Sequence, residues 1–300
     1  MSTPTGLAMT DGGIETVLVY HEGIDLPDFA AFPLLYKPKG RAALQRYFET
    51  FLDLAERTGL PFVIGTPTWR ANRDWGERLG YSEADLVTAN TDAVAFVREV
   101  VAGRMDVVVE GVLGPRGDAY LVSNRMHADE AAEYHDAQIA ALKDAGADRV
   151  TALTLTYPDE AVGVIRAARA RDIPVVVSFT VETDGHLPDG TTLADAIAQV
   201  DEATDSAALF FMVNCAHPTH IALGLEGAAS TARIGGIRVN ASKRSHAELD
   251  VATELDEGDP AELARDHAAL RSALSNVQVL GGCCGTDARH VGEIIAAWRR

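Results

Sequence analysis

The sequence predicts a (β/α)8 barrel, an α/β fold in which the whole chain, residues 1–300, forms one domain. Short apolar runs rich in Val and Ile alternate eight times with longer segments of helical periodicity. The chain is also long enough for a barrel-sized core, since 47% of its 300 residues are hydrophobic. No repeat or linker marks a second domain. An open doubly wound sheet fits the same alternation and is the alternative.

Each apolar run is predicted to be a buried parallel strand, because it is apolar on both faces and ends in a Gly or a polar residue. The first strand enters Asp11, and the others cover residues 61–66, 106–111, 149–154, 174–180, 208–213, 233–239 and 276–281. The helices between them are predicted at residues 40–58, 82–102, 128–145, 158–171, 192–203, 220–229, 260–274 and 286–298.

Local sequence signals agree with these helices. Ser82 and Asp85 form a capping pair before a periodic apolar stretch, and Gly59 and Gly146 stand where a helix ends in a left-handed residue. The first long helix is predicted to bury one face, made of Leu44, Tyr47, Phe48, Phe51 and Leu54 or Ala55.

Charge and composition exclude several classes of partner. The net charge is -18, and no basic stripe is present to neutralise phosphates, so neither nucleic acid nor an anionic membrane is expected as a partner. The N-terminus lacks the basic and apolar blocks of a signal peptide, and apolar runs such as residues 207–213 are too short to span a bilayer. A cytoplasmic protein in a reducing compartment is expected, and no feature predicts its oligomeric state.

All three cysteines lie at the ends of predicted strands. Cys215 follows the sixth strand, and Cys283 and Cys284 follow the eighth. In a barrel the carboxyl ends of the strands build the active site, so the three thiols are expected to converge there. Three thiolates suit Zn²⁺, which prefers sulfur ligands and tetrahedral geometry, and they leave a fourth position open.

Inert burial is the alternative explanation for the thiols, because cysteine is among the residues most often buried. The flanking glycines favour the metal site. Gly281, Gly282 and Gly285 allow the backbone to turn sharply, so that both adjacent sulfurs can face one centre.

These motifs resemble the homocysteine S-methyltransferase family, which includes betaine-homocysteine methyltransferase and the homocysteine module of cobalamin-dependent methionine synthase. The resemblance rests on Gly281-Gly282-Cys283-Cys284-Gly285-Thr286, Asn214-Cys215 and Asp11-Gly12-Gly13. Further matching stretches are Thr66-Pro67-Thr68-Trp69, Gly111-Val112-Leu113-Gly114-Pro115, Ser178-Phe179-Thr180, Asp189-Gly190-Thr191 and Asn240. The resemblance covers nearly the whole chain.

The resemblance implies zinc-dependent methyl transfer to a small thiol. The family's zinc ligands correspond to Cys215, Cys283 and Cys284, and the acceptor thiol takes the fourth position. Coordination lowers the pKa of the acceptor, so a thiolate attacks a small cationic donor of the S-methylmethionine, S-adenosylmethionine or betaine type. Substrate-binding residues are expected at Asp11, Gly12, Gly13, Glu15, Thr66, Trp69, Thr154, Asn214 and Asn240.

Aromatic side chains near the site are candidates for a wall against the cationic donor, which they would stabilise through a cation–π contact. Trp69 is the first candidate and Tyr157 the second. For either ring, an ordinary place in the core or at the rim is the alternative.

One departure from the family bears on the acceptor. Members that use homocysteine commonly carry Glu-Thr at the end of the fourth strand, where the carboxylate holds the ammonium group of the amino acid, and this chain has Leu153-Thr154. A leucine cannot pair with an ammonium, and burial of that charge without a partner is unfavourable. Either Asp11 or Glu15 has taken over the role, or the acceptor is a thiol without an amino group.

Other charged residues near the motifs have less specific roles. Arg70 and Arg73 follow the second strand and are candidates to hold a substrate carboxylate, with solvated surface charge as the alternative. His217, His220 and His246 are expected to be hydrogen-bonded structural groups and not ligands of zinc.

Two other functions remain open on the sequence. The adjacent Cys283 and Cys284 suit a redox-sensing or binding module on a barrel scaffold. Lys243 suits a metal-free Schiff-base aldolase, although that enzyme would give the three cysteines no role.

Overall fold

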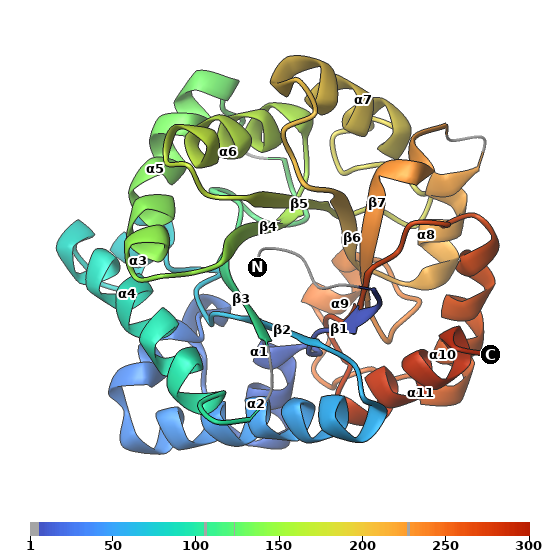
Figure 1. The fold of residues 1–300 in the computed structure, drawn as a ribbon, viewed down its shortest axis with the longest axis horizontal. Coiled ribbons are helices and arrows are strands. Elements are labelled where there is room, and N and C mark those ends of the chain that lie inside the picture. The colour runs from blue at the N-terminus through green and yellow to red at the C-terminus, as the bar shows by residue number, and fades with distance from the viewer. Residues whose placement is uncertain (1–5, 105–106, 123, 227–228) are drawn as a thin grey trace.

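The computed structural model describes residues 6–104, 107–122, 124–226 and 229–300, and it shows a closed barrel ringed by helices (Figure 1). Eight parallel strands follow one another around the barrel in the order of the sequence. Ala8 and Met9 pair with Val279 and Leu280, which joins the first strand to the last. The predicted (β/α)8 barrel is therefore confirmed, and the open sheet is wrong.

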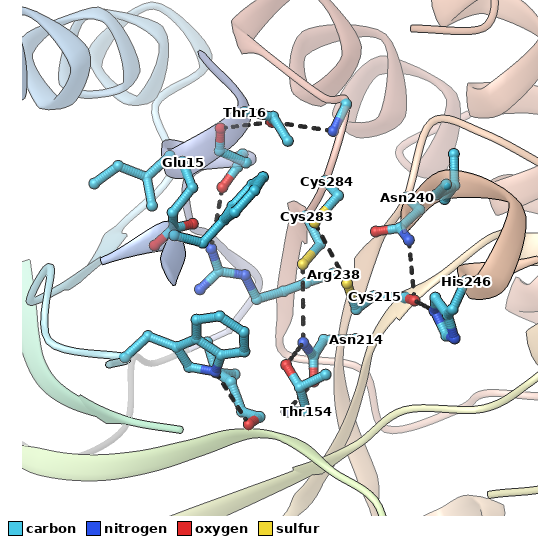
Figure 2. Close-up of a pocket in the computed structure, with 18 of the residues that line it drawn as sticks. Glu15, Thr16, Thr154, Asn214, Cys215, Arg238, Asn240, His246, Cys283 and Cys284 are labelled. Atoms are coloured by element: carbon cyan, nitrogen blue, oxygen red, sulfur yellow. Dashed lines mark hydrogen bonds between the residues drawn. The ribbon is translucent and has the colours of Figure 1, made fainter. Parts of the chain in front are cut away.

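The strands are short, as expected for a barrel interior. They are β1 (Ala8–Met9), β2 (Phe62–Gly65), β3 (Val107–Leu113), β4 (Arg149–Leu155), β5 (Val175–Phe179), β6 (Phe211–Ala216), β7 (Ile234–Val239) and β8 (Val279–Gly282). All of them except β5 contribute residues, at or near their carboxyl ends, to the lining of the pocket drawn in Figure 2.

Long helices cover the outside of the barrel. They are α2 (Pro38–Thr58), α4 (Glu83–Val100), α5 (Ala128–Asp144), α6 (Pro158–Ala170), α7 (Leu193–Thr204), α8 (Pro218–Leu225), α10 (Pro260–Ala269) and α11 (Ala288–Trp298). Three short helices lie in the loops at the carboxyl ends of the strands: α1 (Ile14–Thr16), α3 (Arg73–Arg78) and α9 (His246–Asp250). Among the described residues, no helix combines the length and apolar character needed to cross a membrane.

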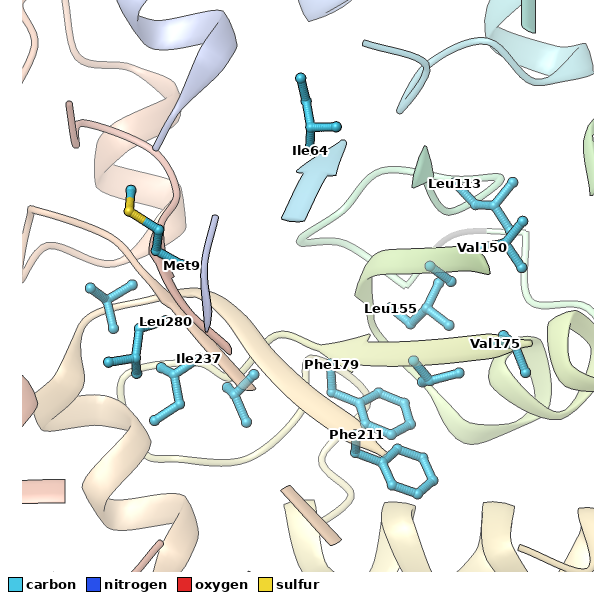
Figure 3. Packing of buried hydrophobic residues seen from close by; sticks show 14 of the residues in the cluster. Met9, Ile64, Leu113, Val150, Leu155, Val175, Phe179, Phe211, Ile237 and Leu280 are labelled. Carbon is cyan, nitrogen blue, oxygen red and sulfur yellow. The ribbon is translucent and has the colours of Figure 1, made fainter. Parts of the chain in front are cut away.

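Alternate residues of each strand pack on different sides of the barrel wall. One set, which includes Ile64, Leu155, Phe211 and Ile237, joins the apolar faces of the helices in the main core (Figure 3). The other set, which includes Ala8, Val63, Val108, Val176, Met212 and Val279, forms a separate cluster with Phe210 from the turn before β6, and no described helix takes part in it. This second cluster fills the barrel interior, as the period of two in a strand requires.

Above that apolar layer the interior becomes charged. Glu110 on β3 accepts hydrogen bonds from Arg149 at 2.8 Å and from Thr151 at 2.7 Å, and Arg238 on β7 lies 3.9 Å away. Burial opposes ionisation of this carboxyl, but the charges of Arg149 and Arg238 lower the pKa of Glu110 below its usual value. The polar layer lies directly beneath the pocket.

The local signals predicted for the helices are confirmed. Ser82 and Asp85 form a capping box at α4, and Gly59 and Gly146 have left-handed φ values of 66° and 91°. The residues predicted for the inner face of α2 are all buried: Leu44, Tyr47, Phe48, Phe51, Leu54 and Ala55.

Several predicted boundaries are wrong. β6 begins at Phe211 and runs through Cys215, because residues 208–210 form the turn before it. α8 begins two residues earlier than predicted, with Pro218 in its first turn, and ends at Leu225. α11 begins at Ala288 because Asp287 caps it, and α10 passes into a 3-10 turn after Ala269. Asp106, Gly227 and Ala228, which fall in predicted elements, lie outside the described residues.

Candidate functional site

A cavity of about 360 Å³ opens at the carboxyl ends of the strands, and the three cysteines lie in its wall. All twelve residues that the sequence predicts for the site line this one cavity: Asp11, Gly12, Gly13, Glu15, Thr66, Trp69, Thr154, Asn214, Cys215, Asn240, Cys283 and Cys284. The fold thus gathers residues from the ends of β1, β2, β4, β6, β7 and β8 around one space.

The three thiols form a compact cluster (Figure 2). Their Sγ atoms all lie within 4.8 Å of one another, and the Sγ atoms of Cys215 and Cys284 are 3.5 Å apart. A tetrahedral zinc ion with bonds of about 2.3 Å separates its sulfur ligands by about 3.8 Å, so the spacing of these thiols fits that ion. Within the described chain these are the residues whose donor atoms converge as a metal site requires.

Unusual backbone geometry directs Cys215 toward this cluster. Its φ is 59°, in the left-handed region that side chains other than glycine rarely adopt. The pairing of β6 with β7 shifts register between Asn214 and Ala216, so a bulge surrounds the cysteine. Thr154 at the end of β4 also has a left-handed φ, 63°, beside a register shift. Such bulges reorient side chains next to active sites.

Asn214 links these two bulged strands. Its Oδ1 accepts a hydrogen bond from the backbone N–H of Thr154 at 2.8 Å, and its Nδ2 donates to the Thr154 hydroxyl at 2.8 Å. The same Nδ2 lies 3.9 Å from the Sγ atom of Cys283. Asn214 and Thr154 therefore fix the strand ends beside the thiols.

Cys283 and Cys284 lie in a tight turn against the loop that follows β1. A Cβ atom on Gly282 would lie 1.9 Å from Oγ1 of Thr286, and one on Gly13 would lie 2.5 Å from the carbonyl oxygen of Cys283. Gly285 has a φ of 77°. Gly13 and Gly282 are thus required because a side chain at either position would clash, and Gly285 because of its left-handed φ.

The main chain of Cys215 is held by two side chains. Asn240 donates from Nδ2 to its carbonyl oxygen at 3.0 Å, and His246 contacts the same oxygen through Nε2 at 2.7 Å. The other ring nitrogen of His246 lies 3.0 Å from Glu182, so both nitrogens are engaged in hydrogen bonds. His246 is therefore a hydrogen-bonded structural group, as predicted.

Close contact among the three thiols makes their pKa values unequal. Hydrogen bonds from Cys215 and Cys284, together with the charge of Arg238, hold the pKa of Cys283 well below the usual value, while contact with the other two thiols raises the pKa of Cys284. One thiolate at Cys283 is thus the first negative charge to form, and the second and third need a cation to stabilise them. This behaviour and the soft donor set fit a thiophilic divalent ion such as Zn²⁺.

Arg238 ties the strand ends together beneath the thiols. Its guanidinium forms a buried ion pair with Asp11 and donates from Nε to the carbonyl oxygen of Gly282 at 3.1 Å. Tyr47 of α2 donates to the other oxygen of Asp11 at 3.1 Å. Burial opposes the charge of Arg238, but the carboxylate of Asp11 raises the pKa of Arg238. Asp11 is therefore already engaged by an arginine and a tyrosine of the protein.

Glu15 differs from Asp11, because no cation among the described residues forms an ion pair with it. In the part of the chain that the structure describes, the hydrogen bond to its carboxylate comes from its own backbone N–H. Burial, the nearby Cys283 and Asp11 raise the pKa of Glu15 to about 7. Glu15 thus brings a carboxylate without a partner to the cavity wall.

Trp69 lines the cavity, but one cation of the protein already lies against it. The guanidinium of Arg70 lies 3.9 Å from the ring centroid of Trp69 and 3.7 Å from that of Trp75, so it is held between two indoles. Arg70 is only 6% exposed, and burial lowers the pKa of this arginine to about 10. Arg70 and Trp75 both line the cavity.

Three other candidates lie elsewhere. Tyr157 is buried outside the cavity lining, where its hydroxyl accepts a hydrogen bond from the N–H of Met126 at 3.0 Å. Arg73 is half exposed and lies over the ring of Tyr134. Lys243 forms ion pairs with Glu262 and Asp266 on α10, outside the cavity lining.

Tyr120 is a residue of the site that sequence reasoning missed. Its hydroxyl lies 3.0 Å from Sγ of Cys215, and its ring stacks on His246 with centroids 3.9 Å apart. Burial, and then the neighbouring thiols, raise the pKa of Tyr120 well above its usual value. Tyr120 lies in an irregular loop after β3 that carries no motif or periodicity, so the sequence contains no signal for it. Arg238 and Trp75 were missed as well, because neither lies in a recognisable motif.

Known proteins resemble this chain in sequence and fold. The profile of the family described as Homocysteine S-methyltransferase matches residues 8–298. The homocysteine S-methyltransferase YbgG of Bacillus subtilis strain 168 is 28% identical over 209 residues, which are 64% of this chain and 62% of that protein. The match thus spans less than two thirds of the length of YbgG.

Solved structures share the fold. The oxidised form of the homocysteine methyltransferase MmuM from Escherichia coli superposes with a TM-score of 0.76 at 21% identity, covering 97% of this chain and 95% of that one. Its metallated form gives a TM-score of 0.75 at 21% identity, covering 97% and 96%. At this level of sequence identity, the similarity to these structures shows a shared fold. The profile match over almost the whole chain shows that this protein belongs to the homocysteine S-methyltransferase family.

Proposed function

We propose that this protein is a zinc-dependent S-methyltransferase, which moves a methyl group from a small cationic donor to homocysteine. The observation that carries the proposal is the cluster of three thiols in the wall of a cavity at the catalytic end of a barrel. Cys215, Cys283 and Cys284 would hold the metal. Bound Zn²⁺ supplies a Lewis acid that keeps the acceptor sulfur deprotonated near neutral pH.

The protein's own residues shape and fix this centre. Asn214 and Thr154 fix the ends of β4 and β6, and Asn240 fixes the main chain of Cys215. Arg238 lies below the cluster, where its positive charge favours a thiolate at Cys283. A methyl transfer between bound partners gains its rate from such positioning, which contributes about 7–11 kcal/mol in well-oriented systems.

The cavity also suits a cationic donor. Five further acidic residues line it, namely Asp28, Asp118, Asp250, Glu254 and Asp256. In a chain of net charge -18 these carboxylates favour a cation in the cavity. A sulfonium or quaternary ammonium compound is attracted there, whereas an anionic methyl donor is repelled.

The arrangement does not favour the aldolase alternative. A Schiff-base lysine needs a lowered pKa, but the hydrogen bonds that Lys243 donates to Glu262 and Asp266 raise its pKa. Lys243 is also absent from the described cavity lining. The redox-module alternative would use the same thiols without a metal, so it differs from the proposal by zinc content and by methyl transfer.

The test is a methyl-transfer assay with zinc-loaded protein and L-homocysteine. S-methylmethionine, S-adenosylmethionine and betaine, each with a deuterated methyl group, are supplied separately, and labelled methionine is measured by mass spectrometry. The proposal predicts labelled methionine from at least one donor, and its loss in Cys283→Ser. Protein that carries one zinc per chain but makes no methionine from any donor would contradict the proposal.

A further inference from the structure

The cavity wall contains an acidic and a basic side chain, Glu15 and Arg70, that form no ion pair with another described residue. Glu15 receives a hydrogen bond only from its own backbone N–H among the described residues. Arg70 donates from Nη1 to the carbonyl oxygen of Gly117 at 3.3 Å, and no carboxylate of the described chain hydrogen-bonds to it. Both side chains line the cavity that contains the thiols.

Arg70 is more than nine-tenths buried and keeps a donor without an acceptor. Its Nε has no hydrogen-bond partner in the described structure, and neither does the indole Nε1 of Trp75. The guanidinium stacks 3.7 Å from the centroid of the Trp75 ring, so these two N–H donors belong to one small region. A buried donor without an acceptor is unfavourable, and two such donors together indicate a place for an anionic acceptor.

The aromatic sandwich keeps this guanidinium in one position. Trp69 and Trp75 cover its two faces, so its edge remains available for hydrogen bonds in the plane. A carboxylate binds to a guanidinium along that edge. Arg70 is therefore already positioned for a planar anion before any ligand arrives.

The loop that carries Glu15 packs against the cysteine turn, since the N–H of Gly285 donates to the hydroxyl of Thr16 at 3.1 Å. Arg70 lines the same cavity from the loop after β2. A ligand whose sulfur lies at the cysteine cluster therefore shares this cavity with a carboxylate and a guanidinium. An α-amino-acid thiol has an ammonium and a carboxylate group to match them.

Leu153 makes the role of Glu15 specific to this chain. Leu153 lines the cavity at the position where the resemblance leads us to expect a glutamate, and it offers no charge. Asp11, the other acid close by, is engaged by Arg238 and Tyr47. Glu15 is thus the acid near the thiols that a ligand cation can use.

We propose that Glu15 binds the ammonium group, and Arg70 with Trp75 the carboxylate, of a zwitterionic α-amino-acid thiol acceptor. This inference rests on the proposed function, since it places the acceptor sulfur at the cysteine cluster. It makes Glu15 and Arg70 the residues that select an amino-acid thiol over other small thiols.

The experiment is calorimetric titration of zinc-loaded protein with three thiols in the absence of methyl donor. L-homocysteine carries both charged groups, 4-mercaptobutanoate lacks only the ammonium, and 3-aminopropane-1-thiol lacks only the carboxylate. The proteins are wild type, Glu15→Gln, Arg70→Gln and the control Arg73→Gln, which changes an arginine outside the cavity lining. Circular dichroism checks that each variant is folded.

The expected pattern is selective. Glu15→Gln weakens the binding of homocysteine roughly 10- to 100-fold, as loss of a charged hydrogen bond does. It leaves the binding of 4-mercaptobutanoate unchanged. Arg70→Gln weakens the binding of homocysteine and of 4-mercaptobutanoate, and it leaves the binding of 3-aminopropane-1-thiol unchanged. Trp75→Phe, which keeps the stacking but removes one N–H, gives a smaller loss with the same selectivity.

Other outcomes would overturn either this inference alone or the proposed function as well. If Glu15→Gln weakens homocysteine and 4-mercaptobutanoate equally, or if Arg70→Gln leaves homocysteine binding unchanged, the assignment of the two charged groups is overturned while the proposed function stands. If wild-type protein binds none of the three thiols, the proposed function fails, and the inference fails with it.

Discussion

The guanidinium of Arg238 on β7 forms a buried ion pair with Asp11 at the end of β1. The same guanidinium donates to the carbonyl oxygen of Gly282 on β8, so one side chain joins the three strands at the place where the barrel closes. Cys283 directly follows Gly282. The position of the thiol cluster therefore depends on a charge inside the barrel.

Replacement of Arg238 by methionine is expected to destabilise the protein by about 3–5 kcal/mol, because it leaves Asp11 buried without a counter-charge. The free energy of unfolding from urea denaturation measures this loss. Arg166→Met is the control, since Arg166 forms an exposed ion pair with Asp129 on the helical surface and should cost less than about 1 kcal/mol. Equal losses in the two variants would contradict the role given to Arg238.

His267 gives a prediction about acid stability. It is fully buried, neither ring nitrogen has a partner in the described structure, and burial lowers the pKa of His267 to about 3. Between pH 6.5 and 3 the unfolded chain binds a proton there that the folded chain does not, so the free energy of unfolding falls as the pH falls. The contribution is about 2 kcal/mol at pH 5 relative to pH 7.

His267→Leu is expected to remove that part of the acid dependence. Urea denaturation at pH 7 and pH 5 measures it in wild type, His267→Leu and the exposed control His127→Gln. The control should behave as wild type does. If His267→Leu lost as much stability on acidification as wild type, the neutral buried state assigned to His267 would be wrong.

The 3.5 Å contact between the Sγ atoms of Cys215 and Cys284 predicts a protective effect of zinc. In metal-free protein, diamide is expected to join these two cysteines as a disulfide, since they are in contact. Zinc-loaded protein should keep three free thiols under the same conditions, because ligation occupies the sulfur atoms. Peptide mapping by mass spectrometry identifies the bond, and Cys284→Ser should abolish it. Oxidation at equal rates with and without zinc would favour the redox module.

Moving the carboxylate from position 15 to position 153 tests the proposed ammonium-binding site in a second way. Glu15→Ala should lose homocysteine affinity roughly 10- to 100-fold, and adding Leu153→Glu should restore at least tenfold, since that position also lines the cavity. Affinity for 4-mercaptobutanoate should stay constant in all the proteins, because it has no ammonium group. Absence of any restoration would show that a carboxylate at position 153 cannot reach the ligand.

The sequence predicted the fold well, because the barrel depends on patterns along the chain. Eight buried strands could be located from apolar runs, and the cysteine motifs at the ends of β6 and β8 indicated the cluster that the structure shows. Strand order follows chain order in this fold, so chain order alone places both motifs at one end of the barrel.

What the sequence could not predict depends on side-chain direction and on irregular loops. Arg238 was placed in a strand, but a strand apolar on both sides does not reveal that this residue points inward toward Asp11. Trp75 lies on the short helix α3, which gives no periodic signal, so the sandwich around Arg70 could not be foreseen. The choice between Asp11 and Glu15 likewise required the ion pair that engages Asp11.

The central claim is that the three cysteines hold zinc and leave one position for the acceptor thiol. Zinc K-edge X-ray absorption of the zinc-loaded protein, before and after addition of L-homocysteine, tests it most directly. The account predicts three sulfur neighbours at about 2.3 Å in the free protein and four once homocysteine binds. A sulfur count that stays at three with homocysteine present, or a protein that retains no zinc, would contradict it.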